Sequence, residues 1–549
     1  MSARVVYSSE RIVFIQLFLL IGFCALLGRL VYLQVYQDIF LDDQVFTRLD
    51  AQYSLLASRG KILDRNNKVL ALDIKGYSVG IDLEKFEYDQ NTIISLSKIL
   101  KKDPLILANN LKDKATGYRE ISRNINLEKK EELKSKRISG LYFRENLRRS
   151  YPERNIASHV VGLTDIDRKG LQGTELVFQK ELLGRAGRFE GIKGTKNVKL
   201  EGQRTPAVSG KDIKLTIDIN IQSIAYHELE KAIKQYDARS GSVVVISPKT
   251  GDILALVSSP SFDPSDRKNL TDMSKLRNRA TIDVFEPGSV LKPLAMSAII
   301  ESENFSDSME INTSPGWIEY EGYKTSDFRD YGVLNLSEII SLSSNVGMVE
   351  LCKDQDIVHL TNYYKSFGIG RYPTSIMIPA REGFLPHPSK FTPRDKVSSC
   401  YGYGITLSAL QIAQAYSVFA NNGNFVELNL YKEFAFDKPL KERVISEETN
   451  KMILDMLVET VNSARGTASK AQIKNKIVAG KTGTAKESLE EETTYTGTFA
   501  GFVPHDEPEF LGVVVLHGLT GDDYSGGRVS APVFSNIMQQ IFLMKDLKI

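Results

Sequence analysis

The sequence predicts an α+β protein in three parts: an N-terminal transmembrane helix, an elongated pedestal of mixed strands and helices, and a large C-terminal domain. Three observations support this prediction. The chain has 549 residues, too many for one ordinary hydrophobic core. A long apolar run lies near its N-terminus. After Leu215 the sequence changes from polar with short apolar bursts to regular amphipathic segments. The predicted boundaries are therefore 1–37, 38–215 and 216–549.

The apolar run extends from Ile12 to Gly28, and the stretch Leu30–Val35 lengthens it beyond Arg29. At about 1.5 Å per residue the two stretches together span a bilayer core, with the arginine reaching toward the interface. Basic residues precede the run and acidic residues follow it, namely Arg4, Arg11, Asp38, Asp42 and Asp43. The positive-inside rule then places the N-terminus in the cytoplasm and everything after Gln37 outside. One alternative is a cleaved signal peptide, but the run does not end in the small residues that a cleavage site needs. The other alternative is a buried core helix.

The region from Phe46 to about Lys214 is rich in Lys, Arg and Glu. Residues 58–72 predict a strand, a turn at Asn66-Asn67 and a second strand. Residues 94–113 predict two short helices on either side of a proline, and the glycine-rich stretch 182–191 predicts extended hairpins. We expect an elongated mixed domain here.

The C-terminal region contains strand patterns near both of its ends. Residues 240–260 predict two strands joined by a tight turn, and residues 496–504 and 509–518 predict another pair. Helical spacing appears at 218–236 and at 446–463, where Ser446 is the expected N-cap. We therefore expect one antiparallel sheet, built from segments far apart in sequence and covered by helices on both faces.

The composition excludes several classes of function. A formal net charge of +2 gives no surplus positive charge for gripping nucleic acid. The three cysteines, Cys24, Cys352 and Cys400, are too few for a disulfide framework or a zinc site. We expect the last two to be small buried thiols, with a single bridge between them as the alternative. The six histidines form no metal-binding motif, so no metal and no cofactor are expected.

Residues 480–482, Gly-Lys-Thr, resemble the end of a phosphate-binding loop. Such a loop needs a glycine five residues before its second glycine, and Asn475 occupies that position. The following residues read as a strand, whereas a phosphate site needs a helix N-terminus. We reject the nucleotide interpretation and consider Lys481-Thr482-Gly483 as one wall of a serine acyl-transfer site.

A candidate nucleophile lies at Ser289, in the first turn of a predicted buried helix that follows Pro287-Gly288. Lys292 comes three residues later, so its amine and the serine hydroxyl share one helix face. A serine hydroxyl needs a base to take its proton, and a buried lysine near a second cation can be partly neutral. The alternative is a helix-capping serine beside a surface lysine.

Two further motifs strengthen the acyl-transfer interpretation. Ser343-Ser344-Asn345 lies in a helix-compatible run, where its polar groups could relay a proton and bind a peptide amide; a helix cap or turn is the alternative. Lys481 supplies the second cation, and Thr482 and Thr484 point to the same side of a strand. We expect Gly483 to let a substrate backbone lie close.

A second Lys-Thr-Gly occurs at residues 249–251. It joins two predicted strands directly and lacks the neighbours Gly480 and Thr484 of the first copy. We interpret it as a tight turn with an exposed lysine, so the copy that carries chemistry is the later one.

The order S-x-x-K, S-x-N, K-T-G resembles that of a class B penicillin-binding protein, a peptidoglycan D,D-transpeptidase, and is most similar to the division-specific septal type. The stretches that carry this resemblance are 277–293, 343–347, 401–423, 478–485 and 524–538, with 28–36, 58–66 and 148–162 in the N-terminal half. One departure is Cys400, where relatives tend to carry serine.

The resemblance implies a fold, a chemistry and a set of roles. The C-terminal domain would be a penicillin-binding transpeptidase domain and 38–215 a dimerisation-type pedestal. Ser289 would attack the bond between the terminal D-alanines of a stem peptide, with Lys292 as base and Ser343 and Lys481 passing the proton on. Backbone N–H groups of Ser289 and Thr484 would hold the oxyanion. Asn345 would bind the donor amide, and Thr482, Gly483 and Thr484 would line the site for the terminal carboxylate.

The implied partners are peptidoglycan stem peptides, β-lactam antibiotics, a membrane glycosyltransferase and other division proteins. The implied location is the bacterial inner membrane, with a single pass and the catalytic domain outside the cytoplasm, at the division septum. Three alternatives remain: a cell-elongation transpeptidase of the same class, a serine β-lactamase, and a catalytically silent division scaffold. A β-lactamase would be about half this length.

Overall fold

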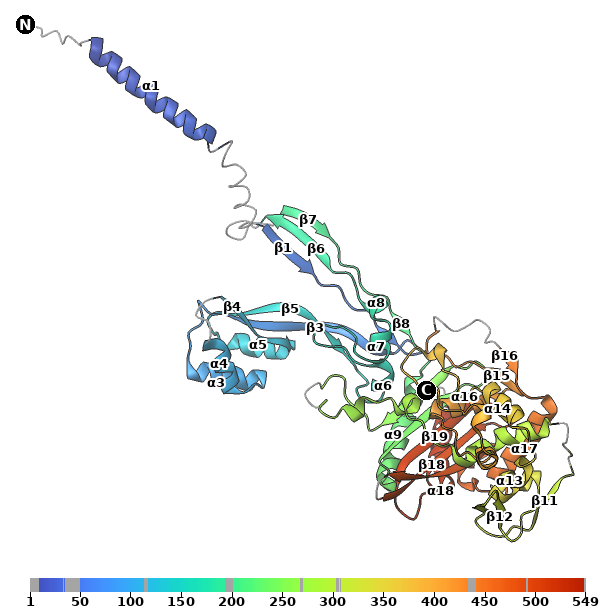
Figure 1. Ribbon diagram of the computed structural model, residues 1–549. Helices are drawn as coiled ribbons and strands as arrows, with labels where there is room; N and C mark the ends of the chain where they lie inside the picture. Colours follow the sequence, from blue (N-terminus) through green and yellow to red (C-terminus); the bar gives the residue numbers. More distant parts are fainter. Residues whose placement is uncertain are drawn as a thin grey trace, which may run out of the picture. The chain divides into compact units, whose positions relative to one another are not determined.

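The computed structural model describes residues 9–32, 34, 50–112, 117–192, 201–266, 270–302, 306, 308–432, 441–489 and 492–547. Two compact units are present, Met1–Ser58 with Gly184–Gly210, and Arg59–Leu183 with Lys211–Ile549. Arg4, Asp38, Asp42 and Asp43, on which the predicted membrane topology depends, lie outside the described residues. Figure 1 labels the elements along the chain.

The first unit contains the apolar helix α1 (Ser9–Val31) and a three-stranded sheet. Within α1, residues Ile12–Val31 have a mean hydropathy of 2.3 and are exposed, so this helix is long and apolar enough to cross a membrane. In the sheet, β6 (Gly187–Ile192) pairs antiparallel with β1 (Asp50–Leu55) and with β7 (Glu201–Thr205). The antiparallel strands β6 and β7 confirm the expected extended pairing, but residues 187–192 form one of the strands, and the connection at 193–200 lies outside the described residues.

The N-terminal part of the second unit is a five-stranded sheet in the order β4-β3-β2-β8, with β5 also paired to β3. Its strands are β2 (Ile62–Leu63), β3 (Val69–Asp82), β4 (Tyr118–Ile125), β5 (Leu141–Ser150) and β8 (Ile213–Lys214). Asn67, with a φ of 65°, makes the predicted turn between β2 and β3. Helices α3 (Gln90–Leu100), α4 (Pro104–Lys112) and α5 (Leu127–Ser135) accompany this sheet. The prediction of two helices divided at Pro104 is confirmed.

A buried ion network explains two of the N-terminal stretches on which the resemblance depends. Glu175 accepts from Arg59 Nε at 2.5 Å and from Arg149 Nε at 2.7 Å. Arg149 also pairs with Asp73 at 3.3 Å, and these side chains are almost completely buried. Removing one partner from such a network would leave an uncompensated buried charge. These arginines therefore fix the packing of 59–183.

The C-terminal region forms one antiparallel sheet in the order β10-β9-β19-β18-β17. The strands are β9 (Ser240–Ile246), β10 (Ile253–Ser259), β17 (Ala479–Leu489), β18 (Glu492–Val503) and β19 (Phe510–Leu519). Strands from both ends of the region thus lie side by side, because β9 pairs with β19. Strand β17 lies at one edge, which leaves its outer side free of strand pairing.

Both faces of this sheet are covered by helices, as predicted. Along β9, Val243 and Val245 join a core with α9 (Ile219–Tyr236) and α18 (Gly526–Asp546). Val244 and Ile246 join a second core with α11 (Lys292–Ile300) and α16 (Ala409–Ala420). This alternation is what a strand buried on both faces requires. Helix α17 (Glu447–Asn462) begins at the predicted cap, where Ser446 accepts from the backbone N–H of Thr449.

Shorter elements complete the second unit. The helices are α6 (Ser158–Val161), α7 (Gly173–Val177), α8 (Gln179–Leu182), α10 (Arg279–Ile282), α12 (Leu336–Ser341), α13 (Asn345–Cys352), α14 (Ile357–Ser366) and α15 (Pro393–Ser399). The strands form three antiparallel pairs, β11 (Glu310–Asn312) with β14 (Val333–Asn335), β12 (Trp317–Tyr320) with β13 (Tyr323–Ser326), and β15 (Asn424–Val426) with β16 (Lys441–Arg443).

The expectation of two unpaired thiols is wrong. Cys352, the last residue of α13, forms a disulfide with Cys400, which follows α15, and their Cα atoms are 6.6 Å apart. The two residues are 48 positions apart in sequence, and only the packing of α13 against α15 brings them together. Cys24 in α1 is free and exposed.

Candidate active site

The predicted nucleophile lies in a tight 3-10 turn, Gly288–Leu291, directly before α11 begins at Lys292. This differs slightly from the expected first turn of an α-helix. Gly288 has a φ of 58°, and a Cβ there would lie 2.9 Å from the carbonyl oxygen of Thr484. A glycine is therefore needed, and the backbones next to Ser289 and at Thr484 come close together. The hydroxyl of Tyr416 donates to the carbonyl oxygen of Val290 at 2.7 Å and fixes the turn from the other side.

Strand β17 packs against this nucleophile turn through Gly483. A Cβ at Gly483 would lie 2.7 Å from the carbonyl oxygen of Pro287 and 3.0 Å from Cγ1 of Val290. This contact is a reason for the glycine that the sequence did not reveal, and the expected room for a substrate backbone stays a prediction. Glycine is required because the strand and the nucleophile turn touch backbone to backbone.

The second motif lies between two helices. Helix α12 ends at Ser341, Ser343 takes a left-handed conformation with a φ of 61°, and α13 begins at Asn345. Ser344 caps α13 by accepting from the backbone N–H of Gly347 at 2.9 Å. The run that the sequence predicted as helix-compatible is therefore broken at the motif. The alternative prediction of a cap and turn is confirmed, because Ser343 forms the turn and Ser344 caps α13.

Lys292 connects the nucleophile turn to the second motif. Its amine donates to the carbonyl oxygen of Ser343 at 2.7 Å, to Oδ1 of Asn345 at 2.8 Å and to the hydroxyl of Ser343 at 3.3 Å. The side chain is fully buried, and burial holds its pKa well below the usual 10.5; repulsion from Lys481 lowers this pKa further, while Asp327 opposes both effects. A neutral amine has two N–H groups and one lone pair. The two short contacts use both N–H groups and leave the lone pair for a proton.

Lys481 is fully buried on β17, and burial lowers its pKa to about 7. The two threonines that flank Gly483 both face the start of α18. The hydroxyl of Thr484 accepts from the backbone N–H of Gly526 at 3.2 Å, and a Cβ on Gly527 would contact Cγ2 of Thr482 at 3.4 Å. These contacts confirm that the two side chains lie on the same side of the strand.

Sequence reasoning missed Asp327. Its Oδ1 accepts from the backbone N–H groups of Asn345 at 2.5 Å and Val346 at 3.0 Å, and its Oδ2 accepts from the hydroxyl of Ser344 at 2.6 Å. This carboxylate therefore holds the start of α13 and stabilises positive charge on Lys292. No spacing rule links an aspartate after β13 to a motif 18 residues later, so the sequence carried no signal for it.

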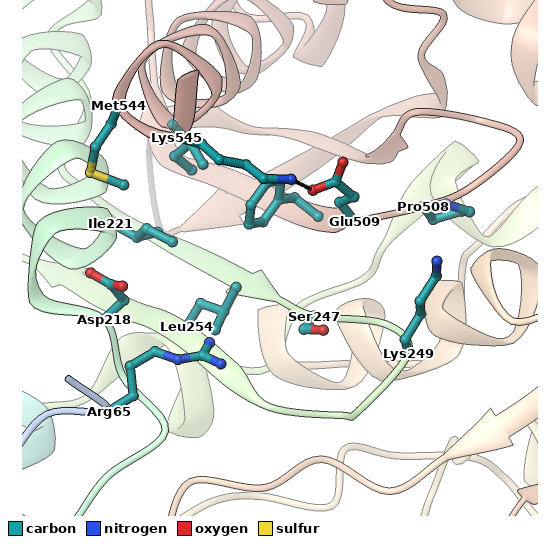
Figure 2. Close-up of a pocket in the computed structure, with 12 residues that line it drawn as sticks. Arg65, Asp218, Ile221, Ser247, Lys249, Leu254, Pro508, Glu509, Met544 and Lys545 are labelled. Carbon is teal, nitrogen blue, oxygen red and sulfur yellow. Dashed lines mark hydrogen bonds and ion pairs between the residues drawn. The ribbon is translucent and has the colours of Figure 1, made fainter. Parts of the chain in front are cut away.

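The earlier Lys-Thr-Gly is a turn, as predicted. It joins β9 to β10, Gly251 has a φ of 72°, and its N–H donates to the carbonyl oxygen of Ser247 at 2.9 Å. Figure 2 shows Lys249 at a separate hollow, with Asp218 at the start of α9 and Met544 near the end of α18. None of the three motifs lines that hollow.

The geometry brings together the serine turn, the Ser-x-Asn turn and the Lys-Thr-Gly strand around two buried lysines. The penicillin binding protein transpeptidase domain family matches residues 241–539, and the penicillin-binding protein dimerisation domain family matches residues 54–215. The chain belongs to the class B penicillin-binding proteins.

Individual relatives support the same assignment. This penicillin-binding protein is 32% identical to the probable peptidoglycan D,D-transpeptidase PbpC of Pseudomonas aeruginosa, over 94% of this chain and 91% of that one. It is 30% identical to the peptidoglycan D,D-transpeptidase FtsI of Escherichia coli, over 95% and 89% of the two chains. The transpeptidase domain of Burkholderia pseudomallei penicillin-binding protein 3 superposes with a TM-score of 0.54 at 29% identity, covering 61% of this chain and 96% of that one.

Proposed function

We propose that this protein cross-links peptidoglycan stem peptides during septal wall synthesis, through an acyl-enzyme on Ser289. The observation that supports the chemistry is the buried Lys292, whose pKa burial holds well below its usual value and whose amine lies between the nucleophile turn and the Ser343–Asn345 turn. A base of this kind is what a serine nucleophile needs. The septal assignment is an extension of the resemblance to the division-specific type, and the 30% identity to the FtsI protein of Escherichia coli is in keeping with it.

In the first step, the hydroxyl oxygen of Ser289 attacks the carbonyl carbon between the terminal D-alanines, and the lone pair of Lys292 accepts the hydroxyl proton. Negative charge develops on the carbonyl oxygen. The backbone N–H groups of Ser289 and Thr484 are the proposed donors to it, since Gly288 brings these backbones together. Removing one such donor typically costs about 3 kcal/mol of barrier.

The C–N bond then breaks, and the proton passes through the hydroxyl of Ser343 and the amine of Lys481 to the departing D-alanine. Asn345 has a side-chain N–H to offer the donor amide beside its contact to Ser326 at 3.1 Å. Thr482 and Thr484 are the proposed contacts of the terminal carboxylate; their side chains face the start of α18, and the backbone between them packs on the nucleophile turn at Gly483. An amine from a neighbouring stem peptide attacks the ester and releases Ser289.

A β-lactam reacts at the same serine, but its leaving nitrogen stays attached to the acyl group through the opened ring system. The ester therefore persists, and β-lactams inhibit the enzyme. We assign residues 1–37 as tail and inner-membrane anchor, 38–215 as a pedestal outside the cytoplasm, and 216–549 as the catalytic domain. A glycan-polymerising membrane glycosyltransferase and other division proteins are the proposed partners of the anchor and pedestal.

A labelled penicillin tests the chemistry. Ser289→Ala should abolish labelling of the full chain in detergent while leaving its thermal unfolding unchanged. Ser308→Ala, at an exposed serine, serves as the matched control and should label normally. Retained labelling of Ser289→Ala would refute the nucleophile, and turnover of the label by the unmodified protein would indicate a β-lactamase. A fluorescent fusion should localise at mid-cell; localisation along the side wall would support the elongation role instead.

A further inference from the structure

An exposed aromatic surface lies beside the second motif, on the hairpin of β12 and β13 and on the loop that follows it. Residues 317–331 contain five aromatic side chains in fifteen positions, in a chain that is 9% aromatic overall. Trp317 is 42% exposed and Phe328 is 98% exposed. Exposed aromatic rings gathered next to polar groups are typical of a binding surface.

This surface adjoins the turn that carries Asn345. The side-chain N–H of Asn345 donates to the carbonyl oxygen of Ser326 at 3.1 Å. Ser326 is the partner of Trp317 across the hairpin, and paired strands lie about 5 Å apart. Three or four residues of extended peptide cover roughly 10–14 Å. A stem peptide whose reacting end is near Asn345 therefore has its other end within reach of Trp317.

Phe328 lies close to Trp317 because the backbone segments before the two rings are joined. The N–H of Asp327 donates to the carbonyl oxygen of Gly316 at 2.9 Å, and these two residues directly precede the rings. A Cβ on Gly316 would lie 3.0 Å from the carbonyl carbon of Arg329. The two exposed rings are therefore carried by segments that pack side by side.

Cationic side chains pack on the rings of this surface. The amine of Lys324 lies 4.2 Å from the ring centre of Trp317, and the guanidinium of Arg329 lies 5.3 Å from that of Tyr331. Such a contact restrains a ring on one face and leaves the other face to a ligand. The cations also place N–H donors beside the rings, and Glu319, which is paired with Lys324 across the hairpin, adds an acceptor.

A surface of this composition fits a saccharide. The C–H groups on the face of a sugar ring carry slight positive charge and pack on the negative face of an aromatic ring. The hydroxyl and acetamido groups at the edge of the sugar need donors and acceptors, which Lys324, Arg329 and Glu319 supply. The substrate of the proposed reaction brings such sugars to the site, because stem peptides are attached to glycan strands. A protein partner on the same surface would block the approach of that substrate.

We propose that this surface, formed by Trp317, Lys324, Phe328 and Arg329, binds the N-acetylated glycan of the acceptor strand. The proposal rests on the proposed transpeptidase function and adds a glycan site to it. The donor peptide is assigned to the edge strand β17, which leaves the hairpin to the second strand, whose amine attacks the acyl-enzyme. Binding the glycan of that strand raises the local concentration of its amine at the ester.

Trp317 is the only tryptophan of the chain, so intrinsic tryptophan fluorescence reports this surface alone. The full chain, in a detergent without a sugar headgroup, is titrated with chitotetraose, a chain of four N-acetylglucosamine units. We expect a saturable change in emission, and cellotetraose, which lacks the acetamido groups, should bind about threefold more weakly or less. Phe328→Ala should weaken the binding of chitotetraose about threefold or more, as the loss of one stacked ring allows. Tyr88→Ala, at an exposed tyrosine of the pedestal, is the matched control and should bind normally.

A transfer assay measures the consequence for the reaction. The protein is acylated by one thioester donor peptide, with active sites counted by labelled penicillin, and is offered a stem peptide with or without its disaccharide. We expect the unmodified protein to favour the acceptor that carries the disaccharide by about fivefold or more. Trp317→Ala should reduce this ratio toward one; if that variant fails to fold, Phe328→Ala takes its place.

An emission spectrum that chitotetraose leaves unchanged would overturn the proposal. Equal binding of the two oligosaccharides would do the same, and so would a transfer ratio near one in the unmodified protein or an unchanged ratio in the folded variants. Emission that shifts with protein concentration alone would mean that a second copy of the chain covers the surface, which also overturns the proposal. The titration needs no catalysis, so absence of both labelling and transfer would refute the transpeptidase function, whereas a saturable titration would still support the glycan site.

Discussion

Replacing Asp327 with asparagine tests whether the Ser343–Asn345 turn has to be held in place for acylation. The substitution keeps the shape of the side chain and removes its charge. In the structure this carboxylate accepts two backbone N–H groups at the start of α13 and the hydroxyl of Ser344, at distances between 2.5 and 3.0 Å. The asparagine oxygen can keep the backbone contacts, but an NH2 group replaces the oxygen that accepts from Ser344, so the substitution removes the charge and this hydrogen bond.

A hydrogen bond to a charged group contributes about 1.5–3 kcal/mol. If this loss appears in the acylation barrier, the rate should fall roughly ten- to hundredfold. The pH dependence should change as well. Asp327 raises the pKa of Lys292, so its loss lowers that pKa, and the rising limb of the profile should move to lower pH.

The assay is the second-order rate of labelling by a fluorescent penicillin between pH 5 and 9, with thermal unfolding as the measure of folding. Asp330→Asn is the matched control, because Asp330 lies on the same exposed loop and contacts Ser314 and Gly332. It should label at the unmodified rate. Labelling of Asp327→Asn within about twofold of the unmodified protein, with the same pH midpoint, would refute the role given to Asp327.

Four further predictions concern Lys481, Gly483 and Cys400. Lys481→Met should cripple acylation and Lys249→Met should not; equal losses of labelling would contradict the choice between the two copies. Lys481 has a pKa of about 7 in the folded protein and 10.5 as its ordinary value, so between these values the unfolded chain binds more protons than the folded one. The free energy of unfolding of the unmodified protein therefore rises from pH 7 to pH 10. The gain in stability of Lys481→Met over the unmodified protein, measured by urea unfolding, should shrink over the same range. Gly483→Ala should slow labelling by pushing the nucleophile turn away, whereas Gly521→Ala, in open space, should label normally; a normal rate for both would show that the close contact is unimportant. Cys400→Ser opens a bridge across 48 residues and should reduce the free energy of unfolding by about 4 kcal/mol on a chain-entropy estimate, measured by denaturant unfolding, and an unchanged midpoint would mean that the bridge does not form.

Much of the fold could be predicted because local patterns determine it. The helix spacing at 218–236, the cap at Ser446 and the strand pairs at 240–260 and 496–518 all appear in the structure. The order of the three motifs also pointed to Ser289, Lys292 and Lys481, because the chemistry requires a hydroxyl, a base and a second cation. The predicted roles of these residues await the experiments above.

What the sequence by itself determined, then, is the apolar anchor, the alternating strands, the helix faces and the residue types that can do the chemistry, since each depends on neighbours within a few positions. Tertiary structure alone decided the partner of Cys352, the contact of Asp327 with α13, the packing of Gly483 on the nucleophile turn, and the place of the β12–β13 hairpin beside Asn345. Each of these depends on two segments that are distant in sequence and meet only when the sheet and its helices pack. The spacing of residues along the chain carries no information about contacts between distant segments. The burial that lowers the pKa of Lys292 and of Lys481 arises from the same packing.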